Sequence, residues 1–222
     1  MTRRFVLELD KLKELLGEMS RLVEGQIEDV ITALFRHDQD LARNVIEYDS
    51  KVDEYEITVD RTCEEIMALS QPVASDLRLL VSGLKMSTDL ERMGDQASNI
   101  AKQLLNQDPI EPSILKSFRI DVMTDFVTDM VTEALDAFTH GDAAQAKAVC
   151  DSDDEVDEIN LYAIQKLSTK DAFGLNPSQR VQMLLISQNL ERIGDLATNI
   201  AEDVIFLVQA RIIKHNYQTF AE

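Results

Sequence analysis

The chain has 222 residues, which is long enough for one or two domains whose hydrophobic cores need no disulfide or metal to fold. It contains only seven glycines, four prolines and no tryptophan, a composition that favours long helices over sheets. The formal net charge of −19 repels nucleic-acid phosphates and anionic lipid headgroups, so direct binding to DNA is not expected.

The sequence gives no sign of export or membrane insertion. Glu8, Asp10 and Glu14 interrupt the apolar residues at the start, so we expect no signal peptide. Nowhere do about 18 apolar residues follow one another, and any membrane association would come through a partner. Cys63 and Cys150 lie within helical patterns without metal-binding spacing, which indicates buried thiols in a cytoplasmic protein.

Three helical patterns follow one another in the first half. Apolar residues at three- and four-residue steps predict a first helix that ends near His37 and has one polar interruption, Gln26. A second stripe repeats every seven residues and stops at Ser70-Gln71-Pro72, because proline removes an amide donor. A third helix begins at Asp76 and stops at the breaker cluster 108–112.

The same succession then starts again. A fourth helix is predicted from Leu115 to Phe138, with a turn at His140-Gly141-Asp142, and a fifth helix follows. The loop 168–176 ends at Asn176, an N-cap followed by Pro177 at the first helical position, which predicts the start of a sixth helix that reaches about Lys214.

The predicted architecture is all-α, with two tandem three-helix bundles made of six long antiparallel helices. Helices of about 30 residues are far above the globular mean of about 11 to 12, and only long bundles accommodate them. Short connections make successive helices antiparallel neighbours. We place the domain boundary at the breaker cluster, so that residues 1–108 form the first bundle and residues 109–222 form the second.

An internal duplication is the strongest feature of the sequence. The segment 90–102 recurs 100 residues later as 190–202, and nine of the thirteen positions are identical. The two halves are therefore tandem copies of one fold. Lys102 stands where the second copy has Glu202, so the copies are not expected to bind metal equally.

Acidic side chains four residues apart lie on one face of a helix, and the pairs recur in both copies. If neighbouring helices lie side by side, these pairs converge on surface sites rich in oxygen ligands, which suit divalent and trivalent cations. A solvated acidic face is the ordinary alternative, but the duplication favours cation binding. The candidate ligands are Asp49, Asp53, Glu91 and Asp95 in the first half and Asp153, Asp157, Glu191 and Asp195 in the second.

Gly94 and Gly194 fall in the middle of helices, where each costs about 1 kcal/mol relative to alanine. Close approach of a neighbouring backbone or a bound metal would compensate for this cost, and simple tolerance within a long helix is the alternative. No glutamate precedes a histidine by three residues, and no nucleotide-binding loop or nucleophile motif occurs. We therefore do not expect an enzyme, although a metal-buffering or metal-dependent helical-bundle enzyme remains the alternative.

The duplicated acidic motif, together with the segment Gln71–Arg78, resembles the PhoU family of phosphate-transport regulators. The resemblance implies pseudo-twofold symmetry between the two bundles and surface metal clusters, often of iron or zinc, at the eight carboxylates. It also implies a cytosolic negative regulator of phosphate uptake and of the phosphate-starvation response. Its expected partners are the ATPase subunit of the phosphate ABC transporter and a sensor histidine kinase, and a homodimer is expected.

Overall fold

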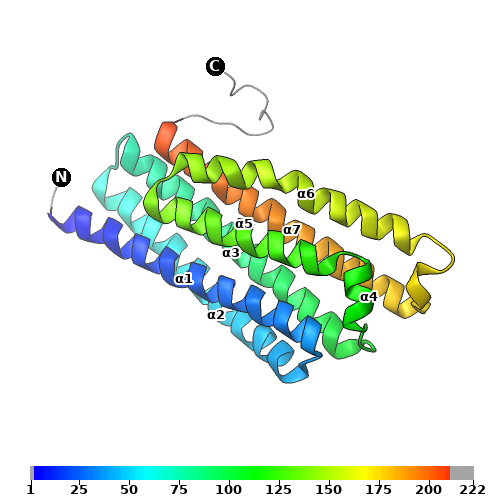
Figure 1. Cartoon of the computed structure of the whole chain (residues 1–222). Coiled ribbons are helices and arrows are strands. Elements are labelled where there is room, and N and C mark those ends of the chain that lie inside the picture. Colours follow the sequence, from blue (N-terminus) through cyan, green and yellow to red (C-terminus); the bar gives the residue numbers. More distant parts are fainter. Residues whose placement is uncertain (1–2, 211–222) are drawn as a thin grey trace, which may run out of the picture.

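A computed structural model describes residues 3–210, whose regular secondary structure is entirely helical, with no strand. The expected all-α class, with two three-helix bundles, is confirmed (Figure 1). The α-helices are α1 (Arg3–Arg36), α2 (Gln39–Ser70), α3 (Ser75–Asn106), α4 (Pro112–Ser117), α5 (Ile120–His140), α6 (Ala143–Leu167) and α7 (Pro177–Gln209). A single 3₁₀ turn, η1 (Ala172–Gly174), precedes α7.

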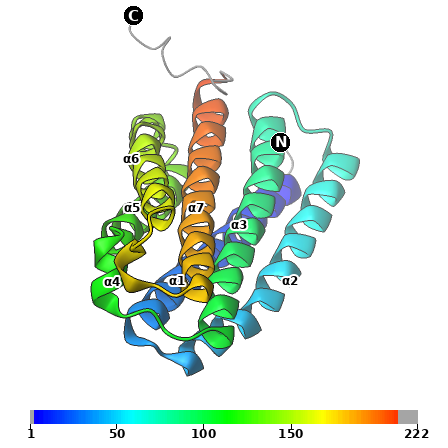
Figure 2. The same ribbon diagram turned by 90° about the vertical axis from the view of Figure 1, so that its right-hand side faces the viewer.

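The two bundles pack through their third helices. Helices α1, α2 and α3 form one bundle, and α5, α6 and α7 form the other. Figure 2 shows α3 and α7 side by side at the centre, with α2 outside on one flank and α5 and α6 on the other. Within residues 3–210, no helix is long and apolar enough to cross a lipid bilayer.

A pseudo-twofold relation is visible in the polar contacts between α3 and α7. Lys85 Nζ lies 2.7 Å from Asp203 Oδ1, and Gln182 Nε2 donates to the Gln103 carbonyl at 3.3 Å, so the two helices run in opposite directions. With the offset of 100 residues, Asp203 corresponds to Gln103, and Gln182 lies within one turn of the residue that corresponds to Lys85. Each contact is therefore nearly the image of the other.

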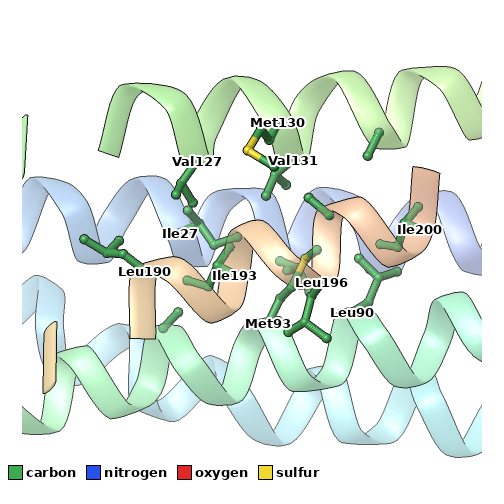
Figure 3. Close-up of a cluster of buried hydrophobic side chains, with 14 of the residues drawn as sticks. Ile27, Leu90, Met93, Val127, Met130, Val131, Leu190, Ile193, Leu196 and Ile200 are labelled. Carbon is green, nitrogen blue, oxygen red and sulfur yellow. The ribbon is translucent and has the colours of Figure 1, made fainter. Parts of the chain in front are cut away.

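The apolar residues of the predicted periodic pattern form a continuous core. Leu90, Met93 and Ile193 are fully buried, and they lie where α3 and α7 meet α1 and α5 (Figure 3). Complete burial of such side chains stabilises the fold by about 1.5 to 3 kcal/mol each. Because the seams of both bundles meet here, the packing that stabilises each bundle also holds the two bundles together.

Side-chain caps begin the helices at the places that the sequence indicates. Asp38 and Asp142, which are 104 residues apart, accept hydrogen bonds from the first amides of α2 and α6. Asn176 and Gln179 form the expected capping box at the start of α7. At these three helices the capping residue is a local signal, because its side chain satisfies amides that the helix itself leaves unpaired, whereas α3, α4 and α5 begin without a side-chain cap.

The prediction of one continuous helix from Leu115 to Phe138 is wrong. The chain turns at Arg119, whose φ is +61°, and this turn separates α4 from α5. Leu115, Phe118 and Ile120, on both sides of the break, are all fully buried. Phe118 also meets Phe173 edge to face, with ring centroids 5.0 Å apart.

The remaining predicted ends agree to within a few residues where they can be compared. The third helix starts at Ser75, and the non-helical residues 107–111 overlap the predicted breaker cluster 108–112, whose last residue, Pro112, begins α4. In the described part of the chain α7 ends at Gln209, and the predicted continuation to Lys214 lies outside the described residues. The division into domains 1–108 and 109–222 stays a proposal.

Candidate functional site

Three of the predicted carboxylates meet in the second bundle. Asp157 comes from α6, and Glu191 and Asp195 come from α7, which packs beside α6. One oxygen of each side chain lies within 4.8 Å of the other two. Asp157 and Asp195 are exposed and Glu191 is partly buried, so this triad opens to the surface.

Asp153, the fourth predicted ligand of this cluster, lies one turn away from Asp157 on α6 and does not join the triad. Its Oδ1 accepts a hydrogen bond from Thr198 Oγ1 at 3.2 Å. Burial, followed by the negative charge of Asp195, raises the pKa of Asp153 to about 6. The structure therefore places it at the inner edge of the cluster, where it interacts with the triad through its charge.

The triad also perturbs its own members. Burial and the charge of Asp195 raise the pKa of Glu191 above its ordinary value. Burial and the charge of Asp157 raise the pKa of Asp195, and Arg192 opposes this shift. Mutual repulsion of this kind is relieved when a cation or a proton binds between the carboxylates.

The corresponding residues of the first bundle lie close together but are more spread out. Among the described residues, Asp49, Asp53, Glu91 and Asp95 do not bring three oxygens as close as the second cluster does. Even so, burial and then the charges of Asp95, Glu56 and the two α2 aspartates raise the pKa of Glu91 to about 7. The four predicted residues therefore share one electrostatic environment at the boundary of α2 and α3.

Gln26 is a buried neighbour of this first cluster. It is only 3% exposed, and its Nε2 donates to the Val45 carbonyl at 3.1 Å. Its Oε1 has no hydrogen-bond partner within residues 3–210. A Cβ atom placed on Gly94 would lie 3.0 Å from this Oε1 and 3.4 Å from Asp49 Oδ1, so both acceptor oxygens face the same notch in α3.

Met130 occupies the place of Gln26 in the second bundle. A Cβ atom on Gly194 would meet Val156 Cγ1 at 3.5 Å and Met130 Cε at 3.8 Å, which are ordinary contacts. We expected a neighbouring backbone or a metal close to the mid-helix glycines, but the atoms nearest to a Cβ on Gly94 belong to side chains of α1 and α2. At Gly194 an alanine would fit.

A further difference between the clusters is the residue pair Lys102 and Glu202. The positive charge of Lys102 lowers the pKa of Asp49, although burial is stronger and the net shift is upward. Glu202 is buried, and its charge adds to the burial that raises the pKa of the Cys150 thiol to about 12. A lysine close to the first cluster competes with a bound cation, whereas the second cluster has no such competitor at this position.

The donor atoms fit a metal. Carboxylate oxygens bind zinc at about 2.0 to 2.2 Å, so the oxygens around one ion lie no more than about 4.4 Å apart. The triad oxygens are within 4.8 Å of one another, and small side-chain rotations bring them into this range. Cys63 and Cys150 are buried thiols whose pKa burial raises to about 12, and neither belongs to the triad.

Two contributors were not recognised from the sequence. Thr198 differs from its counterpart Ser98 by one methyl group, and nothing in the periodicity marks either hydroxyl as a partner of a carboxylate. Gln26 was visible only as a polar interruption of an apolar seam. Comparison of the two copies would have drawn attention to it, because the second copy has Met130 at that position.

Comparison with known proteins identifies the fold and the repeats together. The PhoU domain matches this chain twice, over residues 16–104 and 120–204. The chain belongs to the PhoU family. The two PhoU domain matches contain both acidic clusters, one in each repeat.

Named relatives can be aligned with nearly the whole chain. A phosphate-specific transport system accessory protein PhoU homolog of Pseudomonas putida is 37% identical over 216 residues, which are 97% of this chain and 84% of that protein. The crystal structure of PhoU from Pseudomonas aeruginosa superposes with a TM-score of 0.85 at 37% identity, and the match covers 93% of this chain and all of that one. PhoU from Streptococcus pneumoniae, described as a phosphate transport system regulatory protein, gives a TM-score of 0.83 at 26% identity over 94% of this chain and 98% of that one.

Proposed function

We propose that this chain is an accessory protein of phosphate-specific transport that restrains phosphate uptake and the phosphate-starvation response when phosphate is plentiful. The observation that carries the proposal is the match of both repeats to the PhoU domain, with named accessory and regulatory relatives over nearly the full chain. The family is regulatory and not enzymatic, so the alternative of a metal-dependent enzyme has no support from these relatives.

The proposal includes metal binding at both acidic clusters. The triad of Asp157, Glu191 and Asp195 would hold an ion in the second bundle, with Asp153 adding negative charge beside it. In the first bundle, a cation held by Asp49 would lie beside the unpaired Gln26 Oε1, because both side chains approach the notch at Gly94. Because all of these donors are oxygens, hard or borderline ions are expected, with iron and zinc as the first candidates.

The expected partners are the ATPase subunit of the phosphate ABC transporter and a sensor histidine kinase, which this protein would connect as a cytoplasmic homodimer. The loop between α2 and α3 offers one surface for such contacts. Leu69, Val73 and Leu77 are exposed there to 68%, 69% and 42%, although they are apolar. Exposed apolar side chains on a protein with a net charge of −19 suit a partner surface that combines apolar and basic residues.

Deletion of the gene in its own host tests the regulatory role. A reporter of the phosphate-starvation response should become active in phosphate-rich medium, and the wild-type chain supplied in trans should silence it again. A reporter that stays silent after deletion would contradict the proposed function.

Metal binding is tested with Asp195→Asn, which removes a triad carboxylate. Glu155→Gln is the matched control, because Glu155 is an exposed acid on α6, the helix that provides Asp157, and lies outside the triad. Elemental analysis and calorimetric titration with zinc and iron should show loss of one site in Asp195→Asn only. Equal metal content in all three proteins would contradict this assignment.

The partner surface is tested with the pair Val73→Asp and Leu77→Asp. These substitutions should weaken binding to the transporter ATPase in crosslinking experiments without changing metal content, because neither residue belongs to a cluster. Val181→Asp is the matched control, since Val181 is an exposed valine (57%) at the start of α7. Undiminished crosslinking of the double variant would exclude this loop as the docking surface.

A further inference from the structure

A large groove separates the two bundles at one end of the molecule. Its walls are α1, the start of α3, and the ends of α5 and α7. In Figure 2 this is the end at which the loop between α2 and α3 and the last turn of α7 lie. The groove has a volume of about 840 Å³, which falls within the range of about 300 to 1,000 Å³ that is usual for ligand sites. It is therefore large enough to receive side chains of another molecule.

The groove follows one face of α1. Glu14, Gly17, Arg21 and Glu24 line it at steps of three and four residues, which places them on a single face of the helix. From Lys13 to Glu24 this face extends over about three turns, or about 16 Å. A helical segment of about eleven residues has the same length, so α1 offers one side of a cradle for another helix.

The other walls contribute apolar side chains. Leu79 of α3, Phe138 of α5, and Leu207 and Val208 of α7 line the groove. Val208 is 46% exposed although it is apolar. Apolar side chains that are gathered in an open groove are typical of a surface that binds a partner.

Acidic side chains outnumber basic ones in the lining, and they come from three helices. The acids are Glu14, Glu18, Glu24, Asp76 and Asp136. The lysine and the arginine of the lining are Lys13 and Arg21, and within residues 3–210 no ion pair joins either of them to one of these acids. The negative charge of the groove is therefore available to a ligand.

The effect of this charge is seen at Glu24. Burial raises the pKa of Glu24, and the negative charges of Glu28 and Asp136 add to the shift, although the hydrogen bond from Thr132 Oγ1, at 3.1 Å, opposes it. A cationic group brought into the groove would relieve this repulsion, whereas an anionic group would increase it. The groove therefore favours a ligand with positive charge.

Gly17 leaves the backbone of α1 bare within the groove. A Cβ atom at this position would meet Arg21 Nη1 at 3.7 Å, which is an ordinary contact, so alanine would fit and would suit a helix better. A helix docked in the groove accounts for the glycine, because a bare backbone permits close approach. Gly25 is also free of neighbours but does not line the groove, so it serves as a comparison and not as further support.

We propose that this groove binds one cationic amphipathic helix of a partner protein. The apolar face of that helix packs on Phe138 and Val208, and its lysines or arginines meet the acids of α1 and α5. The same acids repel a nucleic acid or an anionic lipid surface. The inference goes beyond the proposed function, because it depends neither on the acidic clusters nor on the exposed residues Leu69, Val73 and Leu77.

A designed peptide tests the proposal in the full-length protein. The probe is a fluorescein-labelled helix of about four turns that contains only leucine and lysine, with the leucines on one face. Gly17→Trp fills the groove and should raise the Kd measured by fluorescence anisotropy about tenfold or more. Gly25→Trp is the matched control on the same helix and should leave the Kd unchanged. Both variants should retain the helical circular dichroism of the wild-type protein.

Removal of two groove charges tests the electrostatic part separately. Glu14→Gln combined with Asp136→Asn should raise the Kd about fivefold at physiological salt, where distant charges are screened. Asp10→Asn combined with Asp129→Asn is the matched control, because it removes two exposed acids of the same two helices outside the groove. The control pair should leave the Kd nearly unchanged.

The proposal is wrong if Gly17→Trp and Gly25→Trp have the same effect, or if the two pairs of charge variants do, because the peptide would then bind elsewhere. Equal binding of a peptide of the same composition with its leucines scattered around the helix would show that charge alone attracts it. A change in sedimentation between the wild-type protein and Gly17→Trp without peptide would show that a second copy of this chain occupies the groove instead.

Discussion

Replacing Gly94 and Gly194 by alanine should have different consequences, although the two residues are equivalent in the repeats. Alanine gains about 1 kcal/mol over glycine in a helix interior. At Gly194 the new Cβ meets Val156 and Met130 at 3.5 and 3.8 Å, so nothing opposes the gain. Gly194→Ala should therefore stabilise the protein by about 1 kcal/mol, which raises the melting temperature by about 2 to 4 °C for a chain of this size.

At Gly94 the new Cβ would lie 3.0 Å from Gln26 Oε1, and this side chain has to move. Gln26 is held by its hydrogen bond to the Val45 carbonyl at 3.1 Å, and losing such a bond costs about 1 kcal/mol net. The loss of this hydrogen bond offsets the gain in helix propensity, while Asp49 Oδ1, at 3.4 Å from the new Cβ, adds no clash. Gly94→Ala should therefore be neutral or destabilising by about 1 kcal/mol.

Urea denaturation of the metal-free protein, followed by circular dichroism with a chelator present, measures the difference between the two variants. It should be about 1 to 2 kcal/mol. Combining Gly94→Ala with Gln26→Met gives the first repeat the residue that the second repeat has at Met130, and it should restore the stabilisation by alanine. Equal stabilisation by Gly94→Ala and Gly194→Ala would refute the argument, because the Gln26 contact would then have no energetic consequence.

Three further predictions concern pH, the loop before α7 and its cap. Glu91 has a pKa of about 7 in the fold against an ordinary 4.5, so the folded protein holds a proton that the unfolded chain has released. The free energy of unfolding of the metal-free protein should consequently fall as the pH rises between these two values. The urea midpoints measured at about pH 5 and at about pH 8 should therefore differ less in the Glu91→Gln variant than in the wild-type protein. Arg180 donates to the carbonyl of Leu167, the last residue of α6, and to four carbonyls of the loop that follows it, at 2.8 to 3.4 Å. Arg180→Met should therefore make trypsin cleave after Lys170 about tenfold faster, whereas the substitution of the exposed Arg192 by Met should leave the rate unchanged. Asn176→Ala should cost about 1 kcal/mol in urea denaturation, and an unchanged midpoint would mean that the capping box does not stabilise α7.

The carboxylate clusters illustrate how far sequence spacing leads. A separation of four residues places Glu191 and Asp195 on one face of α7, and this part of the prediction depends only on helix geometry. Which residue of α6 joins them depends on the rotation and height of α6 against α7. In the fold Asp157 meets the pair, and Asp153 instead accepts a hydrogen bond from Thr198.

The amino-acid sequence by itself determined the long helices, because the three- and four-residue steps of apolar residues and the caps at Asp38 and Asn176 are local features. It also determined the duplication, because the identical residues of the two copies can be counted. Only the tertiary structure decided the turn at Arg119, which depends on how Phe118 is buried, and the notch at Gly94, where Gln26 and Asp49 come together from two different helices. The physical reason is that helix formation depends on neighbours within one turn. Contacts between helices depend on side chains that are far apart in the chain and that meet only when the whole core packs.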